Sequence, residues 1–157
     1  MSTQVIERII ENTRITRERF VELLDGLTIE QLNKIPAGFA NNIAWNFGHI
    51  VVSQQALCYE RGGFMARIDP VYIPRYVRGS KPEGFISATE VAELKTLAFT
   101  LTDTLSRDLD AATFAGFQPF SNSLGIRITT AIEAAAYSVS HDHLHLGYAM
   151  AQRKLVR

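Results

Sequence analysis

Four long stretches of the sequence carry apolar residues at helical spacing, and this repetition limits the fold more than any other feature. The stretches cover residues 3–25, 41–62, 87–110 and 130–154. Three of them begin at residues that favour helix starts: Asn42 before the second, Ser87 with Glu90 before the third, and Thr130 with Glu133 before the fourth. Long amphipathic helices bury their apolar stripes most simply against one another. We therefore predict an all-α four-helix bundle that forms a single domain over residues 1–157.

The connections between these stretches differ in length and character. Thr28 and Gln31 form a capping-box pattern that predicts a short helical turn after the first helix. Residues 64–86 contain three prolines and two glycines without a sustained period, so they predict a loop. A loop of this length in a small domain is usually functional or mobile. Residues 111–128 contain two β-rich pieces around a polar turn and predict a small hairpin or an extended loop.

Charge and composition argue against several classes of function. The 16 basic and 16 acidic residues balance to zero net charge, which gives no general attraction to nucleic acid or anionic lipid. No window approaches the ~20 apolar residues of a membrane span, and the N-terminal residues lack a signal-peptide pattern. The single cysteine, Cys58, leaves no internal disulfide. We therefore expect a cytoplasmic protein without nucleic-acid or membrane partners.

Three of the four histidines lie within five positions of the fourth predicted helix. At about 100° of rotation per residue, His141 and His145 share one face, whereas His143 lies on the opposite side. Two histidines at i and i+4 on one face can hold a single cation, although an isolated pair is more often structural. His49 lies in the middle of the second helix and completes a three-histidine site if the two helices are neighbours.

Three imidazoles without a fourth protein ligand indicate a catalytic rather than a structural metal site. A structural zinc is normally closed by a fourth ligand, often cysteine, whereas a catalytic ion keeps an open position. Histidine ligands suit Zn²⁺, Ni²⁺ or Fe²⁺, and the sequence does not distinguish among them. Zinc lowers the pKa of a bound water to about 7, which makes hydroxide or a thiolate available as a nucleophile.

Nearby positions on the two helices supply candidates for ring partners and cavity walls. Helical spacing predicts that the following residues fix the histidine rings: Asn46, Ser53, Ser138 and Glu60. The predicted cavity walls are Trp45, Tyr137 and Tyr148. Trp45 is equally compatible with ordinary packing in the core.

Other reactive or charged side chains have simpler interpretations. His143 is expected to pack or to form a dimer contact, and Cys58 to be an inert buried thiol on the far side of its helix. The basic residues of the 64–86 loop either solvate that loop or receive an anionic cosubstrate; they are Arg67, Arg75, Arg78 and Lys81.

Two motifs carry a resemblance to a known family. The segment Trp45-Asn-Phe-Gly-His49 and the later segment His141-Asp-His-Leu-His145-Leu-Gly147 resemble the pattern of the DinB-like family, and the chain's size and helix order fit that family along nearly its whole length. The resemblance implies an up-up-down-down bundle, a metal held by His49, His141 and His145, and a homodimer. Its characterised members include thiol-dependent S-transferases that use bacillithiol or mycothiol, a thiol-dependent isomerase and metal-dependent hydrolases. The family often has glutamine where this chain has Tyr148, which puts the role of that amide in doubt.

Two classes of function follow from these observations. In the first, the protein is an enzyme with a divalent metal ion, and it acts with water or a low-molecular-weight thiol cosubstrate on a small electrophilic molecule held beneath the 64–86 loop. In the alternative, it is a non-catalytic dimeric bundle whose histidine cluster is structural or vestigial. An apolar seam from Ile132 to Met150, opposite the metal face, motivates the alternative. Formal charge on this part of the helix comes only from Glu133 and Asp142, both placed on its flanks.

Overall fold

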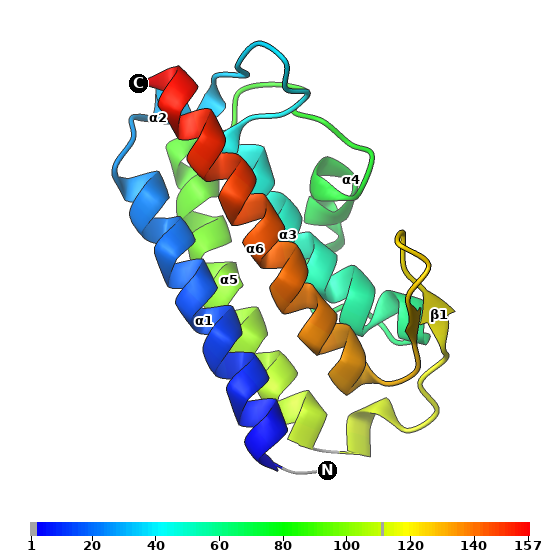
Figure 1. Cartoon of the computed structure of the whole chain (residues 1–157). Coiled ribbons are helices and arrows are strands. Elements are labelled where there is room, and N and C mark those ends of the chain that lie inside the picture. The colour runs from blue at the N-terminus through cyan, green and yellow to red at the C-terminus, as the bar shows by residue number, and fades with distance from the viewer. Residues whose placement is uncertain (1–2, 111) are drawn as a thin grey trace.

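Helices form most of the chain in the computed structural model, which describes residues 3–110 and 112–157. Its long helices lie side by side in a bundle (Figure 1); they are α1 (Thr3–Asp25), α3 (Ile43–Cys58), α5 (Ala88–Asp110) and α6 (Ala131–Val156). The all-α bundle is therefore confirmed. The shorter elements are α2 (Ile29–Asn33), α4 (Ile73–Tyr76), the 3₁₀ turns η1 (Glu60–Gly62), η2 (Pro70–Tyr72) and η3 (Ala112–Phe114), and strands β1 (Phe120–Ser121) and β2 (Arg127–Ile128).

The directions of the long helices differ from the expected order. In Figure 1, α1 and α6 run upward while α3 and α5 run downward. Side-chain contacts agree, because Asp25 at the end of α1 pairs with Lys95 near the start of α5. The predicted up-up-down-down order is wrong, and the bundle is up-down-down-up. The physical reason is that residues 59–87 form the connection that runs back along the bundle, so the second and third long helices are the parallel neighbours.

Local capping fixes where the helices begin. The Asn42 side chain accepts a hydrogen bond of 2.8 Å from the Trp45 backbone N–H, and Thr28 and Gln31 form the predicted capping box. The second long helix was expected to reach residue 62 but ends at Cys58. The chain instead tightens into η1, which is closed by Gly63 with a φ of 88°. A side chain is strongly disfavoured in that left-handed conformation.

The bundle core consists of two apolar clusters. One cluster surrounds the start of α3 and the start of α5, and contains Phe20, Phe47, Ile50 and Leu94 among others. The other surrounds the end of α3 and the start of α6, and contains Ile10, Tyr59, Leu105 and Ala134 among others. The positions between the two clusters on the long helices are polar and buried, so the core is interrupted at mid-height by a polar layer.

Arg17 is the centre of this polar layer. Its side chain is fully buried, and it donates hydrogen bonds to Asp142 Oδ2 (3.0 Å), Gln54 Oε1 (3.3 Å), the Ala98 carbonyl (2.7 Å) and Thr102 Oγ1 (2.9 Å). One side chain of α1 therefore contacts each of the other long helices. The expectation that Asp142 lies on a flank of α6 is wrong, because this carboxylate is fully buried against Arg17.

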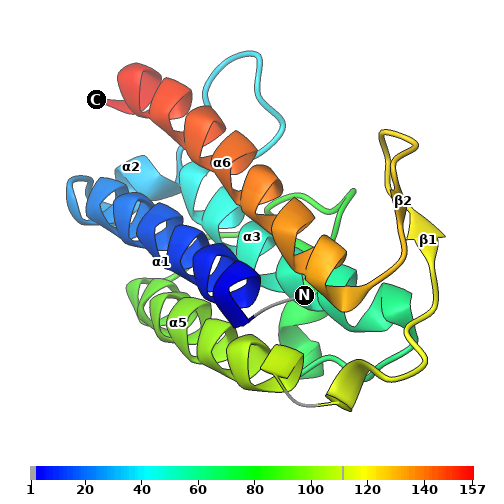
Figure 2. The same cartoon turned by 60° about the horizontal axis from the view of Figure 1, so that its bottom comes forward.

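The two long connections, residues 64–86 and the segment before α6, contain short helices and strands. Residues 64–86 include η2 and α4, and α4 lies against α3 (Figure 2). A Cβ at Gly48 of α3 would lie only 2.4 Å from the Tyr76 ring, so glycine permits this close packing. The predicted hairpin is present, with Phe120 paired antiparallel to Ile128; residue 111, the first of the predicted 111–128 segment, lies outside the described residues. In the described ranges, no helix combines the length and apolar character needed to cross a bilayer.

Candidate metal centre

Three histidine side chains from α3 and α6 converge on one point. His49 of α3 and His141 and His145 of α6 each offer a ring nitrogen within 4.8 Å of the other two. Their ring centroids are 5.1 Å apart for His49 and His141 and 4.5 Å apart for the other two pairs. The antiparallel packing of α3 on α6 brings the single histidine against the i, i+4 pair. The structure thus brings together the three residues that the sequence suggested.

The His49 ring is held by groups on two of its sides. Its Nδ1 lies 2.6 Å from the Tyr76 carbonyl oxygen, which can only accept, so Nδ1 carries the proton and Nε2 carries the lone pair. The Trp45 ring stacks on His49 at a centroid distance of 4.6 Å. The Ser53 hydroxyl lies 3.3 Å from Nε2, where it donates to the lone pair. Trp45, suggested as a cavity wall, and Ser53, suggested as a ring partner, therefore both contact the His49 ring.

The His145 ring is fixed by a chain of amides. Its Nδ1 lies 2.7 Å from Asn46 Oδ1 and is the donor, because Asn46 Nδ2 already donates to Gln152 Oε1 at 3.0 Å. Gln152 Nε2 in turn donates to the Asn41 carbonyl at 2.7 Å. This chain orients the Asn46 amide and leaves His145 Nε2 free. A hydrogen bond at the distal nitrogen is the usual way in which a ligating histidine is held.

His141 leaves a buried nitrogen unsatisfied. Among the described residues, no group hydrogen-bonds to its Nδ1. A buried polar nitrogen without a partner costs free energy. The donor set of three imidazoles fits Zn²⁺ or a similar ion, which histidine nitrogens bind at about 2.0–2.1 Å.

Burial keeps the three imidazoles neutral. Desolvation, reinforced by the nearby His49, lowers the pKa of His141 from 6.5 to about 4. Desolvation together with the neighbouring His49 and His141 lowers the pKa of His145 to about 3. Desolvation also lowers the pKa of His49, and the Tyr76 carbonyl partly opposes this. Neutral rings at pH 7 expose lone pairs without first having to release protons.

A cavity of about 730 Å³ opens beside the histidines. All three rings line it, together with the predicted wall residues Trp45, Tyr137 and Tyr148. Residues from the 59–87 connection and from the β1–β2 hairpin complete its walls; they are Arg61, Val77, Arg78, Gly79, Asn122, Ser123 and Leu124. The cavity volume is in the range of small-molecule sites.

The family comparison agrees with this arrangement. The sequence pattern that describes the DinB superfamily matches residues 12–149, which include all three histidines. The chain belongs to the DinB superfamily. A comparison with curated proteins finds no match.

One departure of this DinB superfamily chain from the expected pattern involves Tyr148. Tyr148 lines the cavity, is half exposed, and packs edge-on against Phe39 at 5.7 Å. The amide that hydrogen-bonds to one of the three histidines, His145, is instead that of Asn46. Asn46 in turn donates to Gln152, which lies one turn beyond Tyr148. Asn46 is one of the ring partners suggested by the sequence, whereas Gln152 is not.

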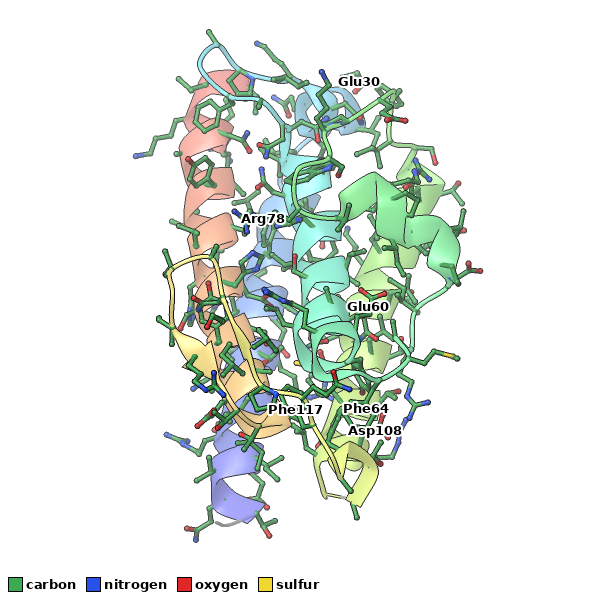
Figure 3. All side chains as sticks on the ribbon, turned by 90° about the vertical axis from the view of Figure 1, so that its right-hand side faces the viewer. Glu30, Glu60, Phe64, Arg78, Asp108 and Phe117 are labelled. Atoms are coloured by element: carbon green, nitrogen blue, oxygen red, sulfur yellow. The ribbon has the colours of Figure 1, made fainter. Side chains whose placement is uncertain are left out.

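Two predicted ring partners lie elsewhere. The Ser138 hydroxyl donates to the Ala135 carbonyl at 2.8 Å within its own helix. Glu60 lies in η1 and is exposed, on the side of α3 away from α6 (Figure 3). Its predicted position assumed that the second helix continues past Cys58, and the helix does not. The sequence did not suggest the Tyr76 carbonyl as a ring partner, because a backbone carbonyl at the end of a short helix leaves no signal in the sequence pattern.

The remaining histidine and the cysteine lie away from the cluster. His143 is exposed, and its Nε2 lies 2.9 Å from Thr16 Oγ1 of α1, which makes it a helix-packing residue. Cys58 is fully buried, and desolvation raises its thiol pKa to about 12. A thiol with such a pKa is a poor nucleophile.

Proposed function

We propose that this DinB superfamily protein is a metal-dependent enzyme, either a thiol-dependent S-transferase or a hydrolase, which acts on a small electrophilic molecule. The observation that carries the proposal is the set of three neutral imidazoles at the wall of a small-molecule cavity, two of them protonated on Nδ1 and therefore carrying the lone pair on Nε2. A divalent ion held there supplies Lewis acidity that favours deprotonation of a thiol or water.

The chain's own residues hold the ligands and shape the cavity. Tyr76 and Asn46 keep the protons of two rings on Nδ1, so that each ring presents a lone pair. Trp45 and Tyr137 form walls that exclude bulk water from one side. No aspartate or glutamate is among the residues that line the cavity, so this part of the described chain offers no carboxylate as a general base.

A second candidate function is the non-catalytic homodimeric bundle. Several apolar side chains along α6 are about half exposed: Leu144, Tyr148, Met150 and Leu155. Exposed apolar surface of this kind favours association with a second copy. The Ile132–Met150 seam is mixed, since Val139 is buried while His143 and Met150 are exposed. Sedimentation at micromolar concentration tests the dimer, and a monomer at all concentrations contradicts it.

The experiment that tests the metal site is a matched pair of alanine variants. His145→Ala is expected to lose stoichiometric metal, as measured by elemental analysis, with unchanged helix content by circular dichroism. His143→Ala is the control, because this exposed histidine lies on the same helix but outside the cluster. Retention of one metal ion per chain in His145→Ala would refute the site. If metal binds but a screen for thiol consumption with and without chelator is blank, the S-transferase reaction is excluded.

A further inference from the structure

The cavity beside the histidines is lined by positive and hydrogen-bond-donating groups but by no acid. Two arginines, Arg61 and Arg78, belong to its wall. Much of the remaining wall is apolar or aromatic: Trp45, Val52, Ala56, Leu57, Val77, Leu124, Tyr137, Leu144 and Tyr148. A site with cationic groups and an apolar body selects ligands that carry the opposite charge on an apolar frame.

The structure distinguishes among the four basic residues of the 64–86 loop, to which the sequence assigned the same two alternative roles. Arg67 pairs with Asp108 at 3.1 Å, and Arg75 pairs with Glu90 at 2.8 Å, so both charges are neutralised outside the cavity. Arg78 has no carboxylate partner in the described ranges, and it lies over the space between α3 and α6 (Figure 3). Of the four basic residues of this loop, Arg78 is the one that lines the cavity.

Arg61 is held in place at a second point of the cavity wall. Its guanidinium donates to the Ser121 carbonyl at 2.8 Å and lies 4.4 Å from the centre of the Phe120 ring. Both contacts are to the β1 strand, and no carboxylate among the described residues pairs with Arg61. A guanidinium anchored by neutral groups keeps its capacity to bind an anion.

Asn122 adds a buried donor on the hairpin side. Its Oδ1 accepts hydrogen bonds from the backbone N–H groups of Leu124 and Ile126, both at 2.9 Å, which fixes the orientation of the amide. Its Nδ2 is buried and has no partner among the described residues. Asn122 is 8% exposed and lines the cavity. An unpaired buried amide N–H₂ is costly, and an acceptor atom from a ligand would satisfy it.

We propose that this cavity binds an organic anion, whose charged group lies against Arg78 and Arg61 and whose apolar body lies along the wall toward the histidines. The inference deepens the proposed function by naming the class of substrate or cosubstrate for the same cavity. It depends on the proposed function only for the reaction, because the arginines and Asn122 recognise the anion without help from a metal.

Two thiols of equal length provide the probes: 6-mercaptohexanoate, which carries a carboxylate, and 6-mercaptohexanol, which does not. Trp45 is the only tryptophan and lines the cavity, so its emission reports binding to the metal-free protein. The same titrations of Co²⁺-substituted protein report thiolate ligation through its charge-transfer absorption. The variants are Arg78→Gln, Arg61→Gln and the control Lys81→Gln, which removes one positive charge from the same loop outside the cavity wall.

Metal-free wild-type protein is expected to bind the carboxylate about five- to tenfold more tightly than the alcohol at low ionic strength. Arg78→Gln should remove most of this preference, Arg61→Gln should reduce it, and Lys81→Gln should retain it. Equal binding of the two probes, no response of Trp45 emission to either probe, or a preference that survives Arg78→Gln overturns the proposal. A preference in metal-free protein combined with no thiolate band in the Co²⁺ protein supports anion binding but contradicts the thiol-dependent reaction.

Discussion

Removing the charge of Arg17 or of Asp142 is expected to destabilise the bundle strongly, and removing both should cost much less than the sum. Both side chains are fully buried, and the Arg17 Nε is 3.0 Å from the Asp142 carboxylate. Arg17→Met leaves that carboxylate buried without its cation. Asp142→Leu leaves a guanidinium that cannot release its proton. Each single change is expected to lower the free energy of unfolding by about 3–5 kcal/mol.

The double variant contains no buried charge at this level. It loses the hydrogen bonds from Arg17 to the neutral groups Gln54, Thr102 and the Ala98 carbonyl, which costs about 1–3 kcal/mol. The coupling energy of the pair is therefore expected to be at least about 3 kcal/mol. Because a typical domain is stable by about 5–15 kcal/mol, the single variants should still be measurable.

The assay is urea unfolding of the metal-free protein at pH 7, with all four members of the cycle measured at equal concentration. Burial raises the pKa of Asp142, and the loss of Arg17 removes the main opposing influence. Because the pKa of Asp142 in the folded variant is raised, the destabilisation by Arg17→Met is fully present at pH values above that pKa. It is relieved as the pH falls from there toward the pKa of the same carboxyl in the unfolded chain. Single-variant costs that add to within about 0.5 kcal/mol would show that the two charges do not act as a pair.

Three further predictions concern the candidate metal centre. Asn46→Ala should weaken zinc binding by about 10- to 100-fold, measured by competition with a chromophoric chelator, because His145 loses the acceptor that orients it; unchanged affinity contradicts this role. Gly48→Ala should lower the free energy of unfolding by about 1–3 kcal/mol, because its Cβ would collide with the Tyr76 ring of α4. The control is Gly147→Ala, which should be neutral or slightly stabilising because a Cβ there meets no atom within 4 Å. Equal urea midpoints for the two variants would refute the collision. Burial lowers the pKa of His141 to about 4 and of His145 to about 3, so below pH 6.5 the unfolded chain takes up protons that the folded metal-free chain does not. The free energy of unfolding should therefore fall between pH 6.5 and pH 4. An equal fall in a variant with both histidines changed to asparagine would exclude this cause.

The long helices were predictable from the sequence because each carries a sustained apolar period, and α3, α5 and α6 also follow a capping residue. The histidine cluster could also be predicted, since His141 and His145 are one turn apart and His49 is the one remaining histidine on another apolar helix. The family resemblance supplied the pairing of α3 with α6, which spacing alone leaves open. Helix directions were predicted wrongly, because they depend on which connection crosses the bundle, and loop length alone does not decide that.

Other parts of the site lie beyond what helical spacing can predict. A backbone carbonyl such as that of Tyr76 has no sequence signature, and the loop that positions it shows no period. Arg17 appears in the sequence as an ordinary charged residue next to the apolar stripe of α1, and its burial becomes evident only from its partners on three other helices. Glu60 was misplaced because the angle was extrapolated past the true end of α3.

The spacing of the three histidines along the chain has a consequence for biosynthesis. His49 leaves the ribosome well before His141 and His145, and the loop that restrains its ring emerges in the interval between them. A nascent polypeptide therefore presents a lone imidazole until its closing helix has docked. The complete set of three ligands therefore exists only after α6 has been translated and has packed against α3.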